Sequence, residues 1–173
     1  MKKFTLFLIL LLGFASFEAY SQTIVSTDPE NKNVILEEFT GIHCVYCPQG
    51  HAIAQAIQDD NPGDVFLINI HTGSFATPSP GEPDFRTDFG DVIVGQTGMG
   101  LSGTGYPGGT VNRHNFPGLE MGGNSGITLM SRSNWTSASN QILAVSSYVN
   151  VAVEAEIDVP TRELTVHVEA YYT

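Results

Sequence analysis

Compact apolar runs and helical spacings alternate along the first half of the chain. Residues 33–39 and 64–71 are short runs of mostly apolar residues, a pattern typical of buried strands. Between them, apolar residues recur at helical spacing over 48–58, beginning at a proline that a first helical turn tolerates. A helix between two buried strands predicts a parallel strand–helix–strand unit.

The next part of the chain alternates between loops and shorter elements. Residues 72–83 are rich in Pro, Gly and Ser and predict a loop, and 95–126 is a long glycine-rich segment. Residues 109–114 predict a short strand, and helices are expected at 84–95 and 133–145. The apolar positions of the two helices are Phe85, Phe89, Val92 and Ile93 in the first, and Trp135, Ala138, Ile142 and Val145 in the second.

Strict alternation of apolar and polar residues marks the end of the sequence. It runs over 148–158 and 164–172, with a turn at 160–161, and predicts a β-hairpin with one buried face. A lone hairpin is marginally stable and must pack on something. We therefore expect a chain that is cut short, in which 147–173 begins a β-sandwich-like domain after a first domain at about 33–146.

Residues 1–21 have the features of a secretory signal peptide. They combine a basic start, a short apolar run at 6–12, and small residues at positions −3 and −1 of a cut before Gln22. The apolar run is too short to span a membrane, which needs about 20 residues. We expect an exported protein, in the periplasm or associated with the outer membrane, with no transmembrane helix in the mature chain. Its cysteines then lie in an oxidising compartment.

The charge and composition of the chain exclude some classes of function. The chain of 173 residues has 7 Lys and Arg against 18 Asp and Glu, a formal net charge of −11, which repels phosphate backbones and excludes nucleic acid as a partner. Residues 98–103 match a GxGxxG pattern but lack the strand and helix that a dinucleotide site requires, and they are interpreted as a loop. No cofactor is predicted.

The CxxC motif formed by Cys44 and Cys47 is the sharpest chemical signal. It follows a buried strand and stands at the expected start of a helix, where the helix dipole and unpaired backbone N–H groups stabilise a thiolate. Cys44 can then attack a partner disulfide, and Cys47 can resolve the mixed disulfide. A CxxC beside a strand–helix–strand unit is typical of thiol–disulfide exchange.

The motif has three other interpretations. The first is an inert disulfide in a binding or adhesion protein, although so short a loop contributes little stabilising entropy. The second is zinc held by Cys44, Cys47 and His51, with His43 nearby, which lacks the paired ligands typical of zinc sites. The third, covalent haem, is excluded because Pro48 stands where a CxxCH motif needs histidine. No metal site is predicted.

Three features of the chain resemble the thioredoxin superfamily. They are the strand–CxxC–helix segment at 34–58, the Glu38-Phe39 pair six residues before Cys44, and Tyr106-Pro107, which looks like a cis-proline loop. The resemblance implies an α/β fold with a central mixed sheet flanked by helices. It also implies that Cys44 is the attacking thiol, Cys47 the resolving thiol, Glu38 a buried proton relay and Pro107 a substrate-docking residue.

Two longer phrases are similar to a narrower family. Leu-Glu-Glu-Phe-Thr-Gly-x-x-Cys-x-x-Cys-Pro and Gly-Tyr-Pro-Gly-Gly-Thr-Val-Asn-Arg resemble Bacteroidetes outer-membrane-associated proteins named for a twenty-eight-kilodalton member. The resemblance covers about 33–173 and implies a thioredoxin-like domain followed by a C-terminal β domain. It also implies secretion to the envelope, where the partners would be protein thiols or disulfides. The chain departs from ordinary thioredoxin, with His43 in place of Trp and Val45-Tyr46 in place of Gly-Pro.

The remaining site residues carry specific expectations. Side chains alternate along a strand, so at most one of Glu37 and Glu38 is expected to be buried, and Glu38 is assigned as that one. His43 is predicted to contact the substrate, and beside Cys44 it is either a stabiliser of the thiolate or an exposed loop residue. Arg113 is expected to be a structural pairing residue. Tyr106-Pro107 is expected to be cis and to lie against Cys44, leaving the Tyr106 backbone free for an extended partner.

Overall fold

The computed structural model describes residues 23–173, so the predicted signal peptide at 1–21 lies outside the described residues. Contacts divide the described chain into two units. One is Pro29–Ser147, and the other is Tyr148–Thr173 together with the described residues up to Asp28. Within residues 23–173, no helix combines the length and the apolar character needed to cross a membrane.

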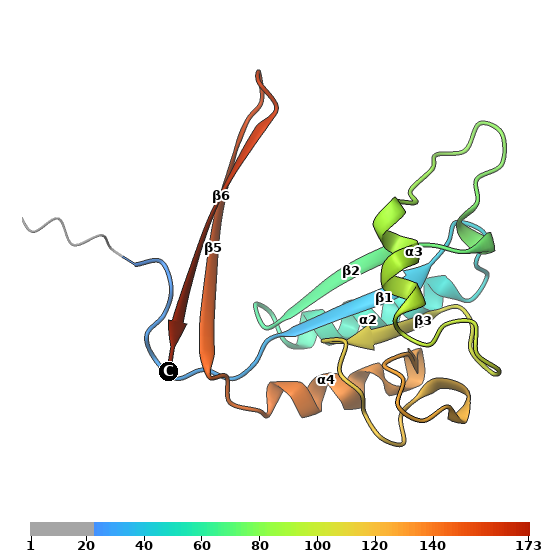
Figure 1. The fold of residues 1–173 in the computed structure, drawn as a ribbon, viewed down its shortest axis with the longest axis horizontal. Coiled ribbons are helices and arrows are strands. Elements are labelled where there is room, and N and C mark those ends of the chain that lie inside the picture. Colours follow the sequence, from blue (N-terminus) through green and yellow to red (C-terminus); the bar gives the residue numbers. More distant parts are fainter. Residues whose placement is uncertain (1–22) are drawn as a thin grey trace, which may run out of the picture. The chain divides into compact units, whose positions relative to one another are not determined.

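A four-stranded mixed sheet forms the centre of the larger unit. Its strands are β1 (Val34–Thr40), β2 (Val65–His71), β3 (Gly108–Val111) and β4 (Met130–Ser131), in the order β2-β1-β3-β4 (Figure 1). β1 pairs with β2 in parallel, while β3 is antiparallel to β1 and to β4. The helix α2 (Cys47–Asp60) connects β1 to β2 and confirms the predicted parallel strand–helix–strand unit.

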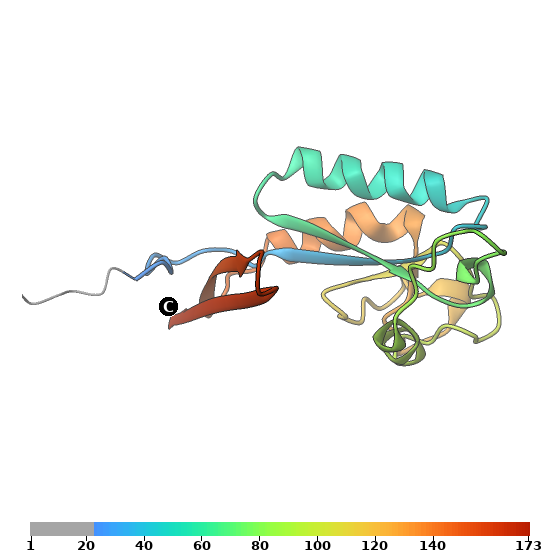
Figure 2. The same cartoon turned by 90° about the horizontal axis from the view of Figure 1, so that it is seen from above.

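Helices cover both faces of this sheet. α2 and α4 (Trp135–Leu143) lie on one face and α3 (Asp88–Gly95) on the other (Figure 2). Each face has its own apolar cluster, because successive side chains of a strand point to opposite faces. The α2 side includes Val34, Leu36, Ile57, Trp135 and Ile142, and the α3 side includes Phe39, Ile70, Val94 and Leu129. The predicted mixed sheet flanked by helices is confirmed, and it is consistent with a thioredoxin-like fold.

Because both faces of the sheet are covered, two neighbouring carboxylates on β1 are both buried. The expectation that at most one of Glu37 and Glu38 is buried is wrong, because their exposed fractions are 5% and 1%. They do point to opposite faces, as alternation requires, but a strand in the middle of a layered sheet is covered on both. Burial of Glu38 is confirmed.

The helix expected at 84–95 is shorter and turned differently. α3 begins at Asp88, after Thr87 accepts a hydrogen bond from the N–H of Gly90 at 3.2 Å. Gly90 and Val94 face the sheet, whereas Phe85, Phe89 and Val92 are exposed. The expected apolar side is therefore wrong at three of its four positions. The small Gly90 and Val94 let the helix approach the sheet more closely than its phenylalanines would. These large apolar side chains remain on the surface.

The smaller unit contains the predicted hairpin. β5 (Val149–Asp158) and β6 (Glu163–Tyr172) are antiparallel, in a register that runs from Val149 opposite Tyr172 to Asp158 opposite Glu163. One face is apolar, as the alternation predicts, but within the described chain this face is exposed rather than buried. Its members are Val151, Val153, Ile157, Leu164, Val166 and Val168.

Candidate active site

Cys44 and Cys47 form a disulfide at the start of α2, with their Cα atoms 5.4 Å apart. Cys47 is the first helical residue, while Cys44 lies in the turn before it rather than in the helix itself. α2 lies wholly within the described residues and has neither a side-chain cap nor an acidic residue in its first turn. Its free N–H groups therefore favour negative charge on a sulfur after the disulfide opens. Cys44 is 7% exposed and Cys47 only 1%, so an incoming thiol meets Cys44.

The Tyr106–Pro107 peptide bond is cis, as predicted. The Pro107 ring packs against α2 beside Gly50, where a Cβ would lie 3.1 Å from Pro107 Cγ. Gly50 is one helical turn after Cys47, so the proline packs against the helix that begins at this cysteine. Contact between Pro107 and Cys44 itself stays a prediction.

The side chain of Tyr106 is an internal anchor. Its ring makes an edge contact with Phe75, with centroids 5.6 Å apart, and its hydroxyl oxygen lies over Gly73, where a Cβ would be 2.6 Å from it. Burial raises the pKa of Tyr106. The Tyr106 side chain is thus held within the fold, and pairing of its backbone with a partner stays a prediction.

Glu38 lies beneath the first turns of α2. Its Oε2 is 2.9 Å from His51 Nδ1, whereas its buried Oε1 has no hydrogen-bond partner among the described residues. A Cβ at Gly50 would lie 2.5 Å from Oε1, so a larger residue there would displace the carboxyl. Burial raises the pKa of Glu38, and the charge and hydrogen bond of His51 offset only part of that rise.

The sequence did not predict His51 as the partner of Glu38. The histidine lies on α2, one turn after Cys47, and its Nε2 is 3.4 Å from Thr40 Oγ1. The available signal was its position one turn after the cysteine, on a helix that packs on the strand of Glu38. The zinc interpretation gains no support, because the two sulfurs are bonded to each other and residues 23–173 hold no cluster of three or more metal-ligating side chains.

His43 sits on the exposed side of the disulfide. Its Nε2 is 3.0 Å from Glu82 Oε2, and both side chains are half exposed. Hydrogen bonds from the Ser79 backbone, together with His43, hold the pKa of Glu82 below its usual value. When His43 is protonated, Glu82 neutralises part of its charge, which weakens its effect on a Cys44 thiolate. The roles of His43 as thiolate stabiliser and substrate contact stay predictions.

A cation that the sequence did not predict lies beside the motif. Arg132 donates from Nε to Gln49 Oε1 at 2.9 Å, and its guanidinium carbon is 5.8 Å from the centre of the Tyr46 ring. Arg132 and Gln49 are 83 residues apart in the sequence, so no local pattern links them. The pair fastens the loop after β4 to the first turn of α2 and places a positive charge over the CxxC turn.

The residues of the Gly-Gly-Thr-Val-Asn-Arg phrase pack and form hydrogen bonds within the sheet. A Cβ at Gly109 would lie 2.7 Å from the Glu37 carbonyl and 2.9 Å from the Trp135 ring, so the strand can pass only with glycine. Asn112 accepts a hydrogen bond from the N–H of Ile35 at 2.6 Å, which extends the pairing of β3 with β1. Arg113 donates from Nε to Glu37 Oε2 at 2.8 Å and from its terminal nitrogen to Oε1, which confirms its structural pairing.

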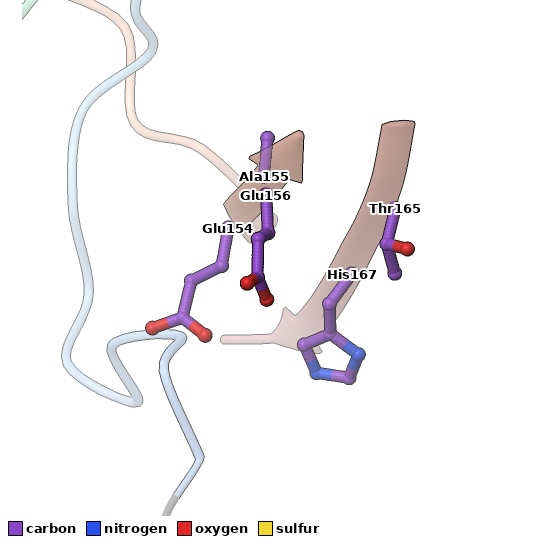
Figure 3. A pocket seen from close by; sticks show the side chains of 5 residues that line it. All are labelled: Glu154, Ala155, Glu156, Thr165 and His167. Atoms are coloured by element: carbon purple, nitrogen blue, oxygen red, sulfur yellow. The ribbon is translucent and has the colours of Figure 1, made fainter. Parts of the chain in front are cut away.

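A shallow depression of about 450 Å³ lies on the polar face of the hairpin (Figure 3). Glu154 and His167 are opposite each other across the two strands, and so are Glu156 and Thr165. Ala155 completes the lining. None of the predicted site residues lines this depression, so it is not the site of the disulfide chemistry.

Comparisons with known proteins support the fold. Neither a search against protein-family models nor a search of curated proteins finds a match. Among solved structures, HBP35 of Porphyromonas gingivalis matches with a TM-score of 0.56 and 22% identity, over 83% of this chain and 43% of that chain. This chain thus spans less than half of that protein's chain. The chain therefore shares an α/β fold with a Bacteroidetes protein, and this fold and the CxxC disulfide fit a thioredoxin-like protein.

Proposed function

We propose that this protein is a thioredoxin-like thiol–disulfide oxidoreductase that acts through Cys44 and Cys47. The observation that carries the proposal is the buried, half-paired carboxyl of Glu38 beneath the helix that begins at Cys47. A disulfide that only staples a loop has no use for a neighbouring buried carboxyl, which costs stability unless it is fully paired. Exchange has such a use, because Cys47 must gain or lose a proton in an apolar setting.

The exchange proceeds in two steps. A partner thiolate attacks Cys44 Sγ, the Cys44–Cys47 bond breaks, and Cys47 leaves as a thiolate that takes up a proton. A second partner thiol then loses its proton and attacks the partner sulfur of the mixed disulfide, which releases Cys44 as a thiolate. The partner dithiol is oxidised by two electrons and the protein disulfide is reduced. The same steps in reverse reduce a partner disulfide.

The proposal also assigns a cellular location and a class of partner proteins. Export through residues 1–21 would put the protein in the periplasm or at the outer membrane, with envelope protein thiols or disulfides as substrates. The two phrases shared with the Bacteroidetes outer-membrane-associated family support this, as does the structural likeness to a Bacteroidetes protein. In the same proposal, 33–146 is the thioredoxin-like domain and 147–173 begins the β domain.

A binding or adhesion protein with an idle disulfide is the second candidate. The low exposure of Cys44 favours it, because an incoming thiol has little of the sulfur to reach. The two candidates differ in the stability of the disulfide. Inert structural disulfides have reduction potentials below about −300 mV, and catalytic ones lie higher.

The test combines a measurement of the reduction potential with the trapping of mixed disulfides. Equilibration of the full chain with glutathione buffers gives the potential, and Cys47→Ser is mixed with glutathione disulfide and with envelope extract. Exchange predicts a potential above about −300 mV and mixed disulfides on Cys47→Ser that are absent from the matched Cys44→Ser variant. A lower potential with no mixed disulfide from Cys47→Ser overturns the oxidoreductase proposal and supports the idle disulfide.

A further inference from the structure

We propose that His51 is the proton outlet of the site, passing the proton of Cys47 between the buried Glu38 and solvent. This inference rests on the proposed exchange function and adds a residue to its machinery. It starts from a contrast in exposure. Glu38 is 1% exposed and cannot trade a proton with water directly, whereas the His51 side chain is 40% exposed.

The geometry supplies a continuous route. Glu38 Oε2 and His51 Nδ1 are 2.9 Å apart, within the range of a strong hydrogen bond. The other oxygen, Oε1, lies under Gly50, and Cys47 and Gly50 are buried on the same face of α2. The carboxyl therefore has one oxygen bound to the histidine. Its other oxygen has no partner within residues 23–173 and lies on the side of the helix that carries Cys47.

The proton transfer balances at named atoms. Before resolution, Glu38 is ionised, and it takes the proton of the Cys47 thiol. The resulting thiolate attacks Cys44 Sγ and expels the partner thiolate. Glu38 then passes its proton to His51 Nδ1, and His51 releases one proton from Nε2 to water. An imidazole can do this because its two nitrogens exchange donor and acceptor roles between tautomers.

Few other charges influence this pair. On β2, His71 lies opposite Thr40, and its pKa is lowered by burial and further by the charge of His51. The lowered pKa of His71 favours its neutral form, so His71 adds no competing positive charge beside Glu38. From β3 and the loop before it, Gly109 and Pro107 approach Glu38, and neither carries a titratable side chain. The route from the carboxyl to water thus runs through a single titrating ring.

The experiment separates the two steps of exchange. The reduced full chain is mixed with glutathione disulfide, and stopped-flow and quenched samples follow the mixed disulfide on Cys44 and then its resolution by Cys47. For His51→Gln we expect the first step within about twofold of wild type and the second about tenfold slower, a modest part of a general acid–base contribution.

Two further variants keep the test selective. In His51→Ala, added imidazole should restore resolution in proportion to its neutral form, because the position is open to solvent. His114→Gln is the matched control, since His114 is an exposed histidine whose ring contacts Phe116. Both steps should be unchanged in it.

The possible failures are distinguishable. If the wild type forms no mixed disulfide at all, the exchange function is overturned and the outlet with it. If the wild type exchanges normally and His51→Gln resolves at the wild-type rate, the function stands and the outlet is overturned. Equal slowing of both steps, without imidazole rescue, assigns His51 a merely structural role and also overturns the outlet.

Discussion

Two adjacent carboxylates on β1 are buried on opposite faces of the sheet and are treated differently by the fold. On the α3 side, both oxygens of Glu37 accept hydrogen bonds from Arg113. On the α2 side, Glu38 has one oxygen on His51 and one without a partner among the described residues. The first carboxylate is fully compensated and the second is not.

The difference teaches how to separate structural from chemical charges. An arginine is always protonated, so Glu37 faces a permanent positive charge. A histidine titrates near neutral pH, so the charge on Glu38 can change without a rearrangement of the fold. In the proposed mechanism, incomplete pairing marks the carboxylate that exchanges protons, and complete pairing marks the carboxylate that only holds the sheet together.

The largest expected effect comes from removing the compensating cation. Arg113→Met leaves Glu37 as a buried, unpaired carboxylate, and we expect a loss of about 2–3 kcal/mol in the free energy of unfolding. This is less than for a fully buried pair, because Arg113 is half exposed. Urea unfolding of the oxidised protein measures it. The double variant Glu37→Gln/Arg113→Met should recover most of the loss, and a double variant as unstable as the single one would contradict the pairing argument.

The next largest expected effect is on the rates of thiol–disulfide exchange. Glu38→Gln should slow resolution of a Cys44–glutathione mixed disulfide about tenfold or more, because Cys47 loses its proton acceptor, with little change in the first attack by Cys44. Glu37→Gln is the matched control on the opposite face and should leave both rates unchanged. Stopped-flow measurement at neutral pH tests this. Equal slowing of both steps in Glu38→Gln would remove the relay role.

The smallest effect is a pH dependence of stability. Folding raises the pKa of Glu38, so the folded state binds its proton more tightly than the unfolded state does. The stability contributed by the protonated carboxyl is therefore full below the ordinary pKa and is lost as pH rises through the raised value. Glu38→Gln lacks this loss, so its melting temperature should gain on that of the wild type between pH 4 and pH 8. His51 offsets part of the effect, and a constant difference would contradict the raised pKa.

Local patterns predicted what local forces determine. The strand–helix–strand unit, α4 and the hairpin follow from periodicity, because each is a regular element with one apolar face. The burial of Glu37 was not predictable in this way, since alternation assigns a side chain to a face but does not say whether another layer covers that face. The exposed side of α3 was missed for the same reason. β4, with two residues, is too short to form a pattern.

The same distinction between local pattern and tertiary packing applies to the residues of the candidate site. Cys44, Cys47, Glu38 and the cis bond at Pro107 were predicted from motifs and from a family resemblance. The partners that tune them were not. Arg132 reaches Gln49 across 83 residues, and His51 meets Glu38 across a helix–strand interface. Such pairs are set by tertiary packing, and a single sequence carries no record of them.

The phrase from Pro107 to Arg113 has a consequence for what can be inferred when it occurs in another chain. Its glycine, asparagine and arginine are occupied in threading β3 past Trp135, extending the ladder to β1 and neutralising Glu37. None of these three duties involves a sulfur atom. The presence of the phrase in another chain therefore indicates the architecture, whereas under the proposed function the residues at positions 38, 44, 47 and 51 indicate its chemistry.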